Sequence, residues 1–332
     1  MDFRGKRFLV VGGAGLIGSH VVEELLKTEA AEIIVYDNFT RGTMDNLKAA
    51  LADPRVSVFP DGGDIQHQDI LKKAMRGVDG VFLLSAVWLL QCHEYPQTAF
   101  DVNVRGTFNT IMAAIEQKVQ RVVYSSSASV YGDALVTPMT EDHPYNNFTF
   151  YGATKIAGEH FFKSLGHRYG LSWAGLRYMN VYGPRQDYRG AYIAVMHKIL
   201  DRLDQRQRPQ VYGDGSQQYD FVHVVDVARA NVLAMASEVS GRCYNVGRGI
   251  GTTINDLTKL LIRLSGSDAA IEYLPSGLTF VTSRIGCTKN AERDLGYTWT
   301  IDLEEGMKSL IAWRNADKQA MDARRRAVGM LS

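Results

Sequence analysis

Cysteine and long apolar runs are scarce in this sequence of 332 residues. Its three cysteines, Cys92, Cys243 and Cys287, lie far apart without the spacing of a metal or redox motif, which predicts free thiols in a reducing compartment and no metal site. No apolar run reaches the length of a membrane-spanning helix, and the basic N-terminal residues lead into a strand-like segment instead of a signal-peptide core. The composition therefore predicts a cytoplasmic protein without a membrane partner.

An excess of charge of either sign is also missing. The chain has 37 Lys and Arg against 36 Asp and Glu, a net charge of +1. This balance argues against the basic surface typical of nucleic-acid binding, so no nucleic-acid partner is expected and anion recognition has to be local. With 45% hydrophobic and 22% charged residues, the chain can build a large core in one big or two smaller domains.

A glycine-rich turn lies near the start of the chain. Residues 6–11 form a short apolar run, residues 12–18 contain four glycines, and residues 19–27 repeat apolar positions with helical spacing. Gly13, Gly15 and Gly18 match the dinucleotide-binding pattern, in which glycines permit a tight turn, close approach of a pyrophosphate and close helix packing. The predicted cofactor-binding residues of this turn are Gly12, Gly15, Leu16, Ile17 and Gly18.

An acidic residue follows at the distance that this motif requires. Asp37 ends the second predicted strand, residues 32–36, nineteen positions after Gly18. A carboxylate there accepts a hydrogen bond from a ribose 2′-hydroxyl and repels a 2′-phosphate, which favours NAD over NADP. The alternatives are that Asp37 only caps the loop 38–42, or that Arg41 changes the cofactor preference.

A second group of polar residues predicts proton chemistry. Ser125, Ser126 and Ser127 end an apolar run, and Tyr151 and Lys155 lie four positions apart, on one face of a predicted helix. A nearby ammonium lowers the pKa of a phenol, which is normally about 10, and makes the phenolate usable as a base. Alone, the same spacing also fits an ordinary solvated helix face.

The rest of the chain alternates strands with helices, which predicts an α/β fold with a doubly wound parallel sheet. The further strands are predicted at residues 56–59, 80–84, 172–178 and 239–246, and the further helices at residues 69–76, 96–118, 150–168, 191–204, 253–265 and 301–313. Residues 89–95, including His93 and Glu94, are predicted to be a polar loop, residues 211–228 to contain a hairpin, and residues 315–327 to form a solvated helical tail.

Seven segments together resemble the extended short-chain dehydrogenases/reductases of the NAD-dependent epimerase/dehydratase family. They are residues 12–18, 37–42, 63–65, 103–107, 125–132, 151–155 and 177–184. The resemblance implies a Rossmann-type NAD-binding domain at 1–178 with a returning segment at about 220–250, and a smaller, mixed α/β substrate domain at 179–219 and 251–315, before a helical tail at 316–332. It also implies a homodimer formed through a four-helix bundle.

The resemblance assigns roles to individual residues. Ser127, Tyr151 and Lys155 would be catalytic. Further cofactor contacts would come from Asp37, Asn38, Asp64, Ile65, Ser85, Ala86, Asn103, Ser125, Tyr151, Lys155 and Tyr178, and substrate contacts from Ser127, Asn180, Arg185, Tyr219 and Arg284. For two of these the ordinary alternatives stay open, because Asp64 can be a turn acid and Asn103 a satisfied helix residue.

The family resemblance implies a nucleotide-sugar epimerase, acting at C4 of a UDP-hexose or of its acid or N-acetyl derivative. The sequence departs from the family pattern at several positions. Relatives have a phosphate-binding Arg where Tyr219 stands and often a His where Leu83 stands. Related 4,6-dehydratases have Asp and Glu, and decarboxylases a Glu, where this chain has Ala128 and Ser129, which makes dehydration and decarboxylation the weaker alternatives. A non-catalytic NAD-binding sensor is disfavoured because both Tyr151 and Lys155 are present.

Overall fold

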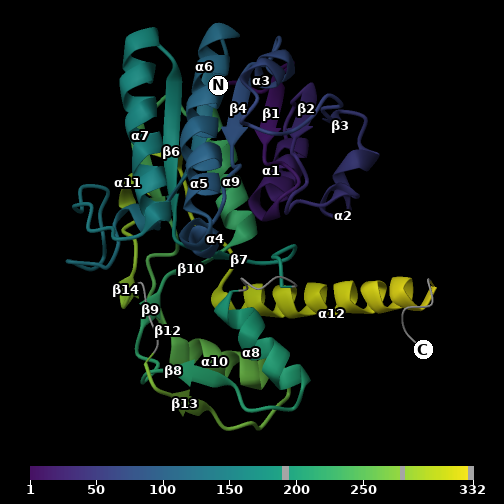
Figure 1. Cartoon of the computed structure of the whole chain (residues 1–332), viewed down its shortest axis with the longest axis vertical. Coiled ribbons are helices and arrows are strands. Elements are labelled where there is room, and N and C mark those ends of the chain that lie inside the picture. Colours follow the sequence, from purple (N-terminus) through teal and green to yellow (C-terminus); the bar gives the residue numbers. More distant parts are fainter. Residues whose placement is uncertain (189–193, 277–280, 328–332) are drawn as a thin grey trace.

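The computed structural model describes residues 1–188, 194–276 and 281–327, with side chains up to 319 in the last helix. A seven-stranded sheet forms its larger part (Figure 1), with strand order β11-β6-β5-β4-β1-β2-β3. All of its pairings are parallel. The strands are β1 (Arg7–Val11), β2 (Glu32–Tyr36), β3 (Val56–Val58), β4 (Gly80–Leu83), β5 (Arg121–Ser127), β6 (Ser172–Tyr178) and β11 (Arg242–Val246). The predicted Rossmann-type sheet is confirmed.

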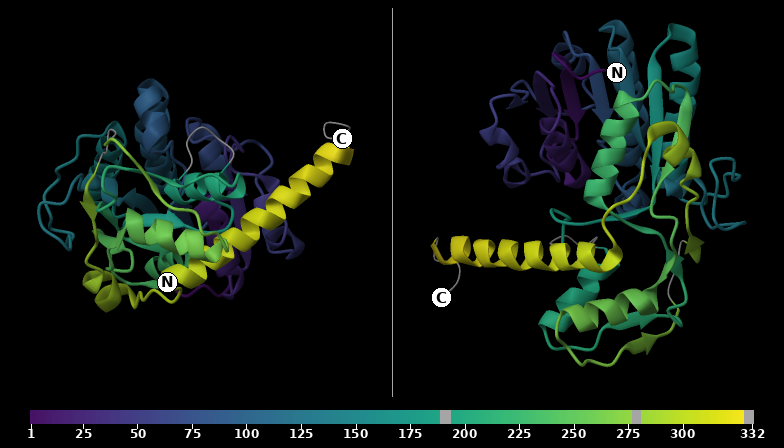
Figure 2. Two further views of the ribbon diagram at one scale, coloured as in Figure 1. Left: turned by 90° about the horizontal axis from the view of Figure 1, so that it is seen from below. Right: turned by 180° about the vertical axis from the view of Figure 1, so that it is seen from behind.

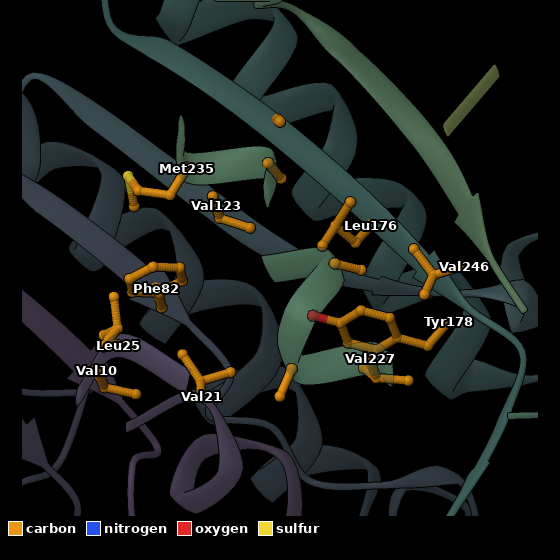
Figure 3. Close-up of a cluster of buried hydrophobic side chains, with 14 of the residues drawn as sticks. Val10, Val21, Leu25, Phe82, Val123, Leu176, Tyr178, Val227, Met235 and Val246 are labelled. Atoms are coloured by element: carbon orange, nitrogen blue, oxygen red, sulfur yellow. The ribbon is translucent and has the colours of Figure 1, made fainter. Parts of the chain in front are cut away.

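Helices cover both faces of this sheet. On one face, α1 (Leu16–Leu26) and α9 (Val224–Ala236) pack against the strands. Figure 3 shows this layer, where Val21 and Leu25 of α1 and Met235 of α9 lie beside Val10 and Phe82 of the sheet. On the other face, α3 (Gln68–Ala74), α6 (Thr107–Glu116) and α7 (Phe150–Tyr169) bury a second apolar cluster. Because helices bury both faces of the sheet, the sequences of its strands are almost continuously hydrophobic.

The strand order reverses between β1 and β4. β1 pairs with β2 on one side and with β4 on the other, so the chain crosses from one half of the sheet to the other beside β1. In open α/β sheets, ligands bind in the crevice outside the carboxyl ends of the strands at such a point. The glycine turn follows β1, Asp37 follows β2, and Ser127 ends β5, so the predicted site residues share this edge.

Two local predictions on this edge were wrong. Residues 89–95 are mostly helical, as α4 (Leu89–Glu94), and the predicted single helix at 96–118 consists of α5 (Pro96–Ala99), a π-helical segment (Phe100–Gly106) and α6. The sequence did not indicate α4 because the apolar contact of this helix is small: only Cys92 in it is fully buried. The π-helical segment carries Asn103, whose side chain is 2% exposed.

The smaller part of the molecule lies at the carboxyl edge of the large sheet (Figures 1 and 2). The predicted hairpin at 211–228 was wrong, because its strands pair with distant partners. β8 (Gln210–Tyr212) pairs with β13 (Glu272–Leu274), β9 (Gln218–Tyr219) with β12 (Thr252–Thr253) and β14 (Ser283–Arg284), and β10 (Phe221–His223) with β7 (Asn180–Tyr182). The sequence around β9 therefore brings Tyr219 next to Arg284, 65 positions later in the chain.

The remaining helices are α2 (Met44–Leu47), α8 (Val195–Asp204), α10 (Ile254–Leu264), α11 (Lys289–Leu295) and α12 (Leu303–Ala327). The predicted start of α8 at 191–193 lies outside the described residues. The helix predicted at 301–313 and the predicted tail form one helix, α12, which projects from the molecule (Figure 2). Buried Arg314 anchors α12 to α8 through Asp201 and Asp204. No helix in the described part of the chain is long and apolar enough to cross a membrane.

Candidate active site

The glycine turn after β1 forms one wall of a cavity of about 320 Å³ at the carboxyl edge. Gly12 has a φ of +82°, and a Cβ there would lie 2.7 Å from the backbone N of Ser85. A Cβ on Gly18 would lie 2.1 Å from the carbonyl O of Gly12, so only glycine lets α1 pack this close to the turn. Gly15, the N-cap of α1, lines the cavity, whereas Leu16, Ile17 and Gly18 are not among its described lining residues. The N-terminus of a helix at such a place is suited to binding a pyrophosphate.

Predicted cofactor residues line much of this cavity. They are Gly12, Gly15, Asp37, Asn38, Asp64, Ile65, Ser85 and Ala86. Asp37 accepts hydrogen bonds from the backbone N–H of Ala14 (2.9 Å) and of Phe39 (2.8 Å), which fixes its carboxylate beside the turn. Each oxygen keeps a lone pair for a ribose hydroxyl. Arg41 pairs with Asp187 at 3.5 Å and stacks over Trp88.

Other predicted cofactor residues have their polar groups engaged in the protein interior. Asn103 accepts a hydrogen bond from Val87 N (2.7 Å) and donates to Val87 O (2.8 Å), holding the segment that follows β4. The hydroxyl of Ser125 lies 2.9 Å from that of Tyr178, which donates to Asn231 at 2.9 Å. The side chains of these residues stabilise the walls of the site, and their contact with a cofactor stays a prediction.

The predicted catalytic residues meet where β5 ends and α7 begins. Ser127 interacts with the hydroxyl of Tyr151, and the Nζ of Lys155 lies 5.7 Å from the centre of the Tyr151 ring. Thr149 caps α7 by accepting a hydrogen bond from Gly152 N (3.1 Å), which places Tyr151 in the first turn. Lys155 donates to the carbonyl of Ser125 at 2.7 Å. Tyr151 and Lys155 therefore lie one turn apart on the face of α7 that is turned toward β5.

Burial dominates the ionisation of this pair. It raises the pKa of Tyr151 to about 12, and the hydrogen bond from Ser127 and the charge of Arg284 oppose the rise. Burial also lowers the pKa of Lys155 to about 8. In the chain alone, Tyr151 is therefore protonated at neutral pH. A base at this position needs additional positive charge to ionise.

A second cavity, of about 330 Å³, lies between the sheet edge and the smaller domain. Three predicted substrate residues line it: Asn180, Tyr219 and Arg284. Most of the other lining side chains are apolar or uncharged, including Leu89, Val195, Tyr212, Phe221 and Ile254. The hydroxyl of Tyr219 donates to the carbonyl of Val281 at 2.9 Å. Arg284 is the one cation among the described residues that line this cavity.

Arg185, another predicted substrate residue, is engaged elsewhere. Its guanidinium pairs with Glu23 on α1, and its backbone has a φ of +71°. This ion pair joins the segment after β7 to the cofactor-binding half of the molecule. Arg185 is not among the described residues that line the second cavity. Its direct contact with a substrate stays a prediction.

A buried ion pair that the sequence did not reveal links α7 to β6. Glu159, one turn after Lys155, accepts from Arg177 Nη2 (2.7 Å) and Nε (2.9 Å) and from the hydroxyl of Ser126 (2.5 Å). Both side chains of the pair are about 5% exposed. This network ties α7 to β5 and β6. A charged residue on an otherwise buried helix face, four positions after Lys155, was the available signal.

The chain is similar to known proteins over most of its length. The model of the NAD dependent epimerase/dehydratase family matches residues 8–247. UDP-glucose 4-epimerase of Mycolicibacterium smegmatis is 31% identical over 93% of this chain and 99% of its own, and dTDP-glucose 4,6-dehydratase of an Actinoplanes species is 30% identical over 94% and 98%. The crystal structure of UDP-glucose 4-epimerase from Thermotoga maritima with UDP-glucose superposes with a TM-score of 0.86 at 31% identity, covering 94% of this chain and 99% of that one.

Proposed function

The chain belongs to the NAD dependent epimerase/dehydratase family, and from this premise we propose that it epimerises a nucleotide sugar at C4 through a 4-keto intermediate. The substrate class is a UDP-hexose or its acid or N-acetyl derivative. One observation carries the proposal: Tyr151 is close to lining residues of both cavities. It packs against the cluster of Val87, Cys92 and Ala99, of which Val87 lines the cofactor cavity, and it interacts electrostatically with Arg284, which lines the other cavity.

The residues of the chain divide the reaction between them. The first cavity fits NAD, which would supply reversible hydride transfer at C4. For the configuration to invert, the 4-keto sugar would turn in the second cavity and receive the hydride on its opposite face. Tyr151 takes the proton from the C4 hydroxyl, and Ser127 holds the same oxygen by a hydrogen bond. Lys155 holds the nicotinamide ribose. Asn180 and Arg284 bind the sugar or its diphosphate in the second cavity.

The loop after Ser127 favours epimerisation over the alternatives. A 4,6-dehydratase has to remove a proton and a hydroxyl from neighbouring carbons, which requires an extra acid and base. Ala128 is 1% exposed and has no ionisable group, and Ser129 donates its N–H to Ser127 Oγ at 3.1 Å. With no carboxylate at these positions, renewed reduction of the 4-keto sugar is favoured over loss of water. Dehydration stays the second candidate because one relative is a named dehydratase.

The test is incubation of the purified protein with UDP-glucose, UDP-N-acetylglucosamine, UDP-glucuronic acid and dTDP-glucose, without added reductant. Nuclear magnetic resonance of the products should show the C4 epimer of one UDP sugar. A 4-keto-6-deoxy product from dTDP-glucose would replace the proposal by dehydration. Recovery of all four sugars unchanged from NAD-loaded protein would contradict both activities on these substrates.

The purified protein is expected to carry NAD and not NADP. Asp37, fixed by Ala14 N and Phe39 N, places a negative charge where a 2′-phosphate would lie. Arg41 does not offset this charge freely, because Asp187 and Trp88 already engage it. Mass spectrometry of the cofactor released on denaturation checks the prediction, and a predominance of NADP would overturn it.

Arg284→Ala is expected to weaken the binding of UDP. The diphosphate needs a cationic partner, and losing a charge-assisted contact costs about 1.5–3 kcal/mol, or roughly ten- to a hundredfold in affinity. Tyr219→Arg restores the cation that relatives have beside Arg284 and should bind UDP as tightly as the wild type or more tightly. Calorimetric titration of UDP into the three proteins measures this. Equal affinities would place the diphosphate elsewhere or exclude a nucleotide as the ligand.

We also propose that the protein is a cytoplasmic homodimer. Phe108 of α6 and Phe161 of α7 form an edge contact at 6.2 Å, and Phe100 and Phe108 are 43% and 41% exposed. Pairing this face with its copy would build the four-helix bundle expected from the family and cover these rings. Three free thiols fit a reducing compartment.

A further inference from the structure

Arg284 occupies an unusual place for a guanidinium group. It lies on β14, in register with Tyr219 of β9, and lines the second cavity. Asp133 fixes this strand beside the loop that follows Ser127, because its carboxylate accepts hydrogen bonds from Thr282 N (2.9 Å) and Ser283 N (3.2 Å). The hydrogen bond between Thr282 and Asp133, which are 149 positions apart in the sequence, therefore holds Arg284 against the loop that follows Ser127.

The guanidinium is poorly satisfied there. Its Nη1 lies 3.5 Å from Ser129 Oγ and its Nη2 lies 3.5 Å from the carbonyl of Gly132, both at the limit of a hydrogen bond. Its Nε is buried without a partner. Within the described chain Arg284 forms no ion pair, whereas most of the other buried guanidinium groups, such as Arg177 and Arg314, have carboxylate partners. The charge of Arg284 interacts instead with groups that do not form an ion pair with it, namely the carboxylate of Asp133 and the hydroxyls of Tyr219 and Tyr151.

Tyr151 lies within the range of this charge. Ser129, which Arg284 contacts, donates its N–H to Ser127 Oγ (3.1 Å), the hydroxyl that bonds to Tyr151. The carbonyl of Ser129 also touches the first turn of α7, since a Cβ on Gly152 would lie 2.4 Å from it. The positive charge of Arg284 opposes the effect of burial and lowers the pKa of Tyr151.

Among the other described groups around Tyr151, only Lys155 carries a positive charge at neutral pH. The titratable residues that interact with it are Cys92 on α4, Tyr124 on β5, Lys155 on α7, Tyr178 on β6 and Arg284 on β14. Burial raises the pKa values of Cys92, Tyr124 and Tyr178, so these three are neutral. The ammonium of Lys155 donates a hydrogen bond to the carbonyl of Ser125, and burial lowers the pKa of Lys155 to about 8. Arg284 stays protonated throughout the working range.

We propose that Arg284 is a second cationic residue of the proton-transfer site, which acts through Tyr151 by stabilising its phenolate from the side of the substrate cavity. The proton of the sugar hydroxyl moves to the phenolate oxygen and returns from it, while Arg284 keeps its own protons. Arg284 thus influences the proton transfer only by the effect of its charge on Tyr151. The inference takes Tyr151 as the base from the proposed function, but it does not depend on which sugar reacts.

The test is the ionisation of Tyr151 in the NAD-loaded protein. The near-ultraviolet absorbance of phenolate is titrated with pH, and the titration of Tyr151→Phe is subtracted to isolate this one tyrosine. Arg284→Met and Arg284→Gln remove the charge, Arg284→Lys keeps it, and Arg263→Met removes a guanidinium that pairs with Glu304 on the surface of the same domain. The Met and Gln variants should raise the pKa of Tyr151 by at least about one pH unit, the effect of an opposite charge nearby. The Lys and Arg263→Met variants should titrate close to the wild type.

Kinetics on an accepted substrate give the second readout. The acid limb of the pH profile of kcat should move upward with the spectroscopic transition in Arg284→Gln and stay in place in Arg284→Lys. A Tyr151 transition at the wild-type pH in folded Arg284→Met or Arg284→Gln overturns the inference, even if UDP binding is weakened. A shifted transition in a protein that converts none of the sugars supports the inference while the proposed function fails.

Discussion

Tyr151→Phe is expected to lower turnover by about 10²–10⁴-fold, the range that a positioned acid–base group contributes. Only the hydroxyl that takes the sugar proton is removed, because the ring keeps its packing against the cluster of Val87, Cys92 and Ala99. The fold and the bound NAD should therefore be unchanged. Steady-state rates on the accepted UDP sugar, with the cofactor content of each preparation measured alongside, check this expectation.

Tyr169→Phe is the matched control for this variant. Tyr169 is the last residue of the same helix, 49% exposed and remote from both cavities, so its loss should leave the rate unchanged. Near-normal activity of Tyr151→Phe would move the base to another residue. The first to examine would then be His93, which lies on α4 next to the buried Cys92.

Local sequence patterns were sufficient for the parallel sheet and the glycine turn of the cofactor half, although they missed α4 and the π-helical segment. The glycine turn, the acid after β2 and the alternation of strands and helices each depend on residues a few positions apart. The chemistry of those residue types limits the backbone strongly: Gly12 takes a positive φ and Gly18 leaves no room for a Cβ. The parallel sheet follows because strands separated by helices cannot form hairpins.

The substrate half could not be predicted in the same way. Its short strands pair across long sequence separations, as β9 does with β12 and β14, and strands of two residues carry no periodicity. The predicted hairpin failed for this reason. The positions of Arg185 and Arg284 illustrate the same limit. No local pattern distinguishes these two arginines. Arg185 pairs with Glu23 on α1, whereas Arg284 lines the second cavity.

Local sequence patterns also did not reveal the buried ion pair between Glu159 and Arg177. Among the substitutions proposed, removal of this pair should lower the free energy of unfolding the most. Glu159→Ala leaves the guanidinium of Arg177 buried without its carboxylate, and breaking a buried pair in this way costs about 3–5 kcal/mol. The remaining contacts of Arg177, to the hydroxyls of Tyr131 and Tyr145 and to the backbone carbonyl of Glu141, carry no formal charge. Urea unfolding followed by circular dichroism measures the loss. Glu304→Ala, which breaks an exposed pair with Arg263, should change the free energy of unfolding far less.

The pH dependence of the unfolding free energy distinguishes loss of the Glu159 charge from loss of its packing. Burial works to raise the pKa of Glu159, but its bonds with Arg177, Ser126 and Tyr145 outweigh it and hold the pKa below its ordinary value. A carboxyl with a depressed folded pKa stabilises the protein above its unfolded pKa, about 4.3, and loses this contribution as the pH falls through the folded value. The gap in unfolding free energy between the wild type and Glu159→Gln should therefore be full at neutral pH and narrow in acid. A gap that is constant with pH would assign the effect of Glu159 to packing and not to its charge.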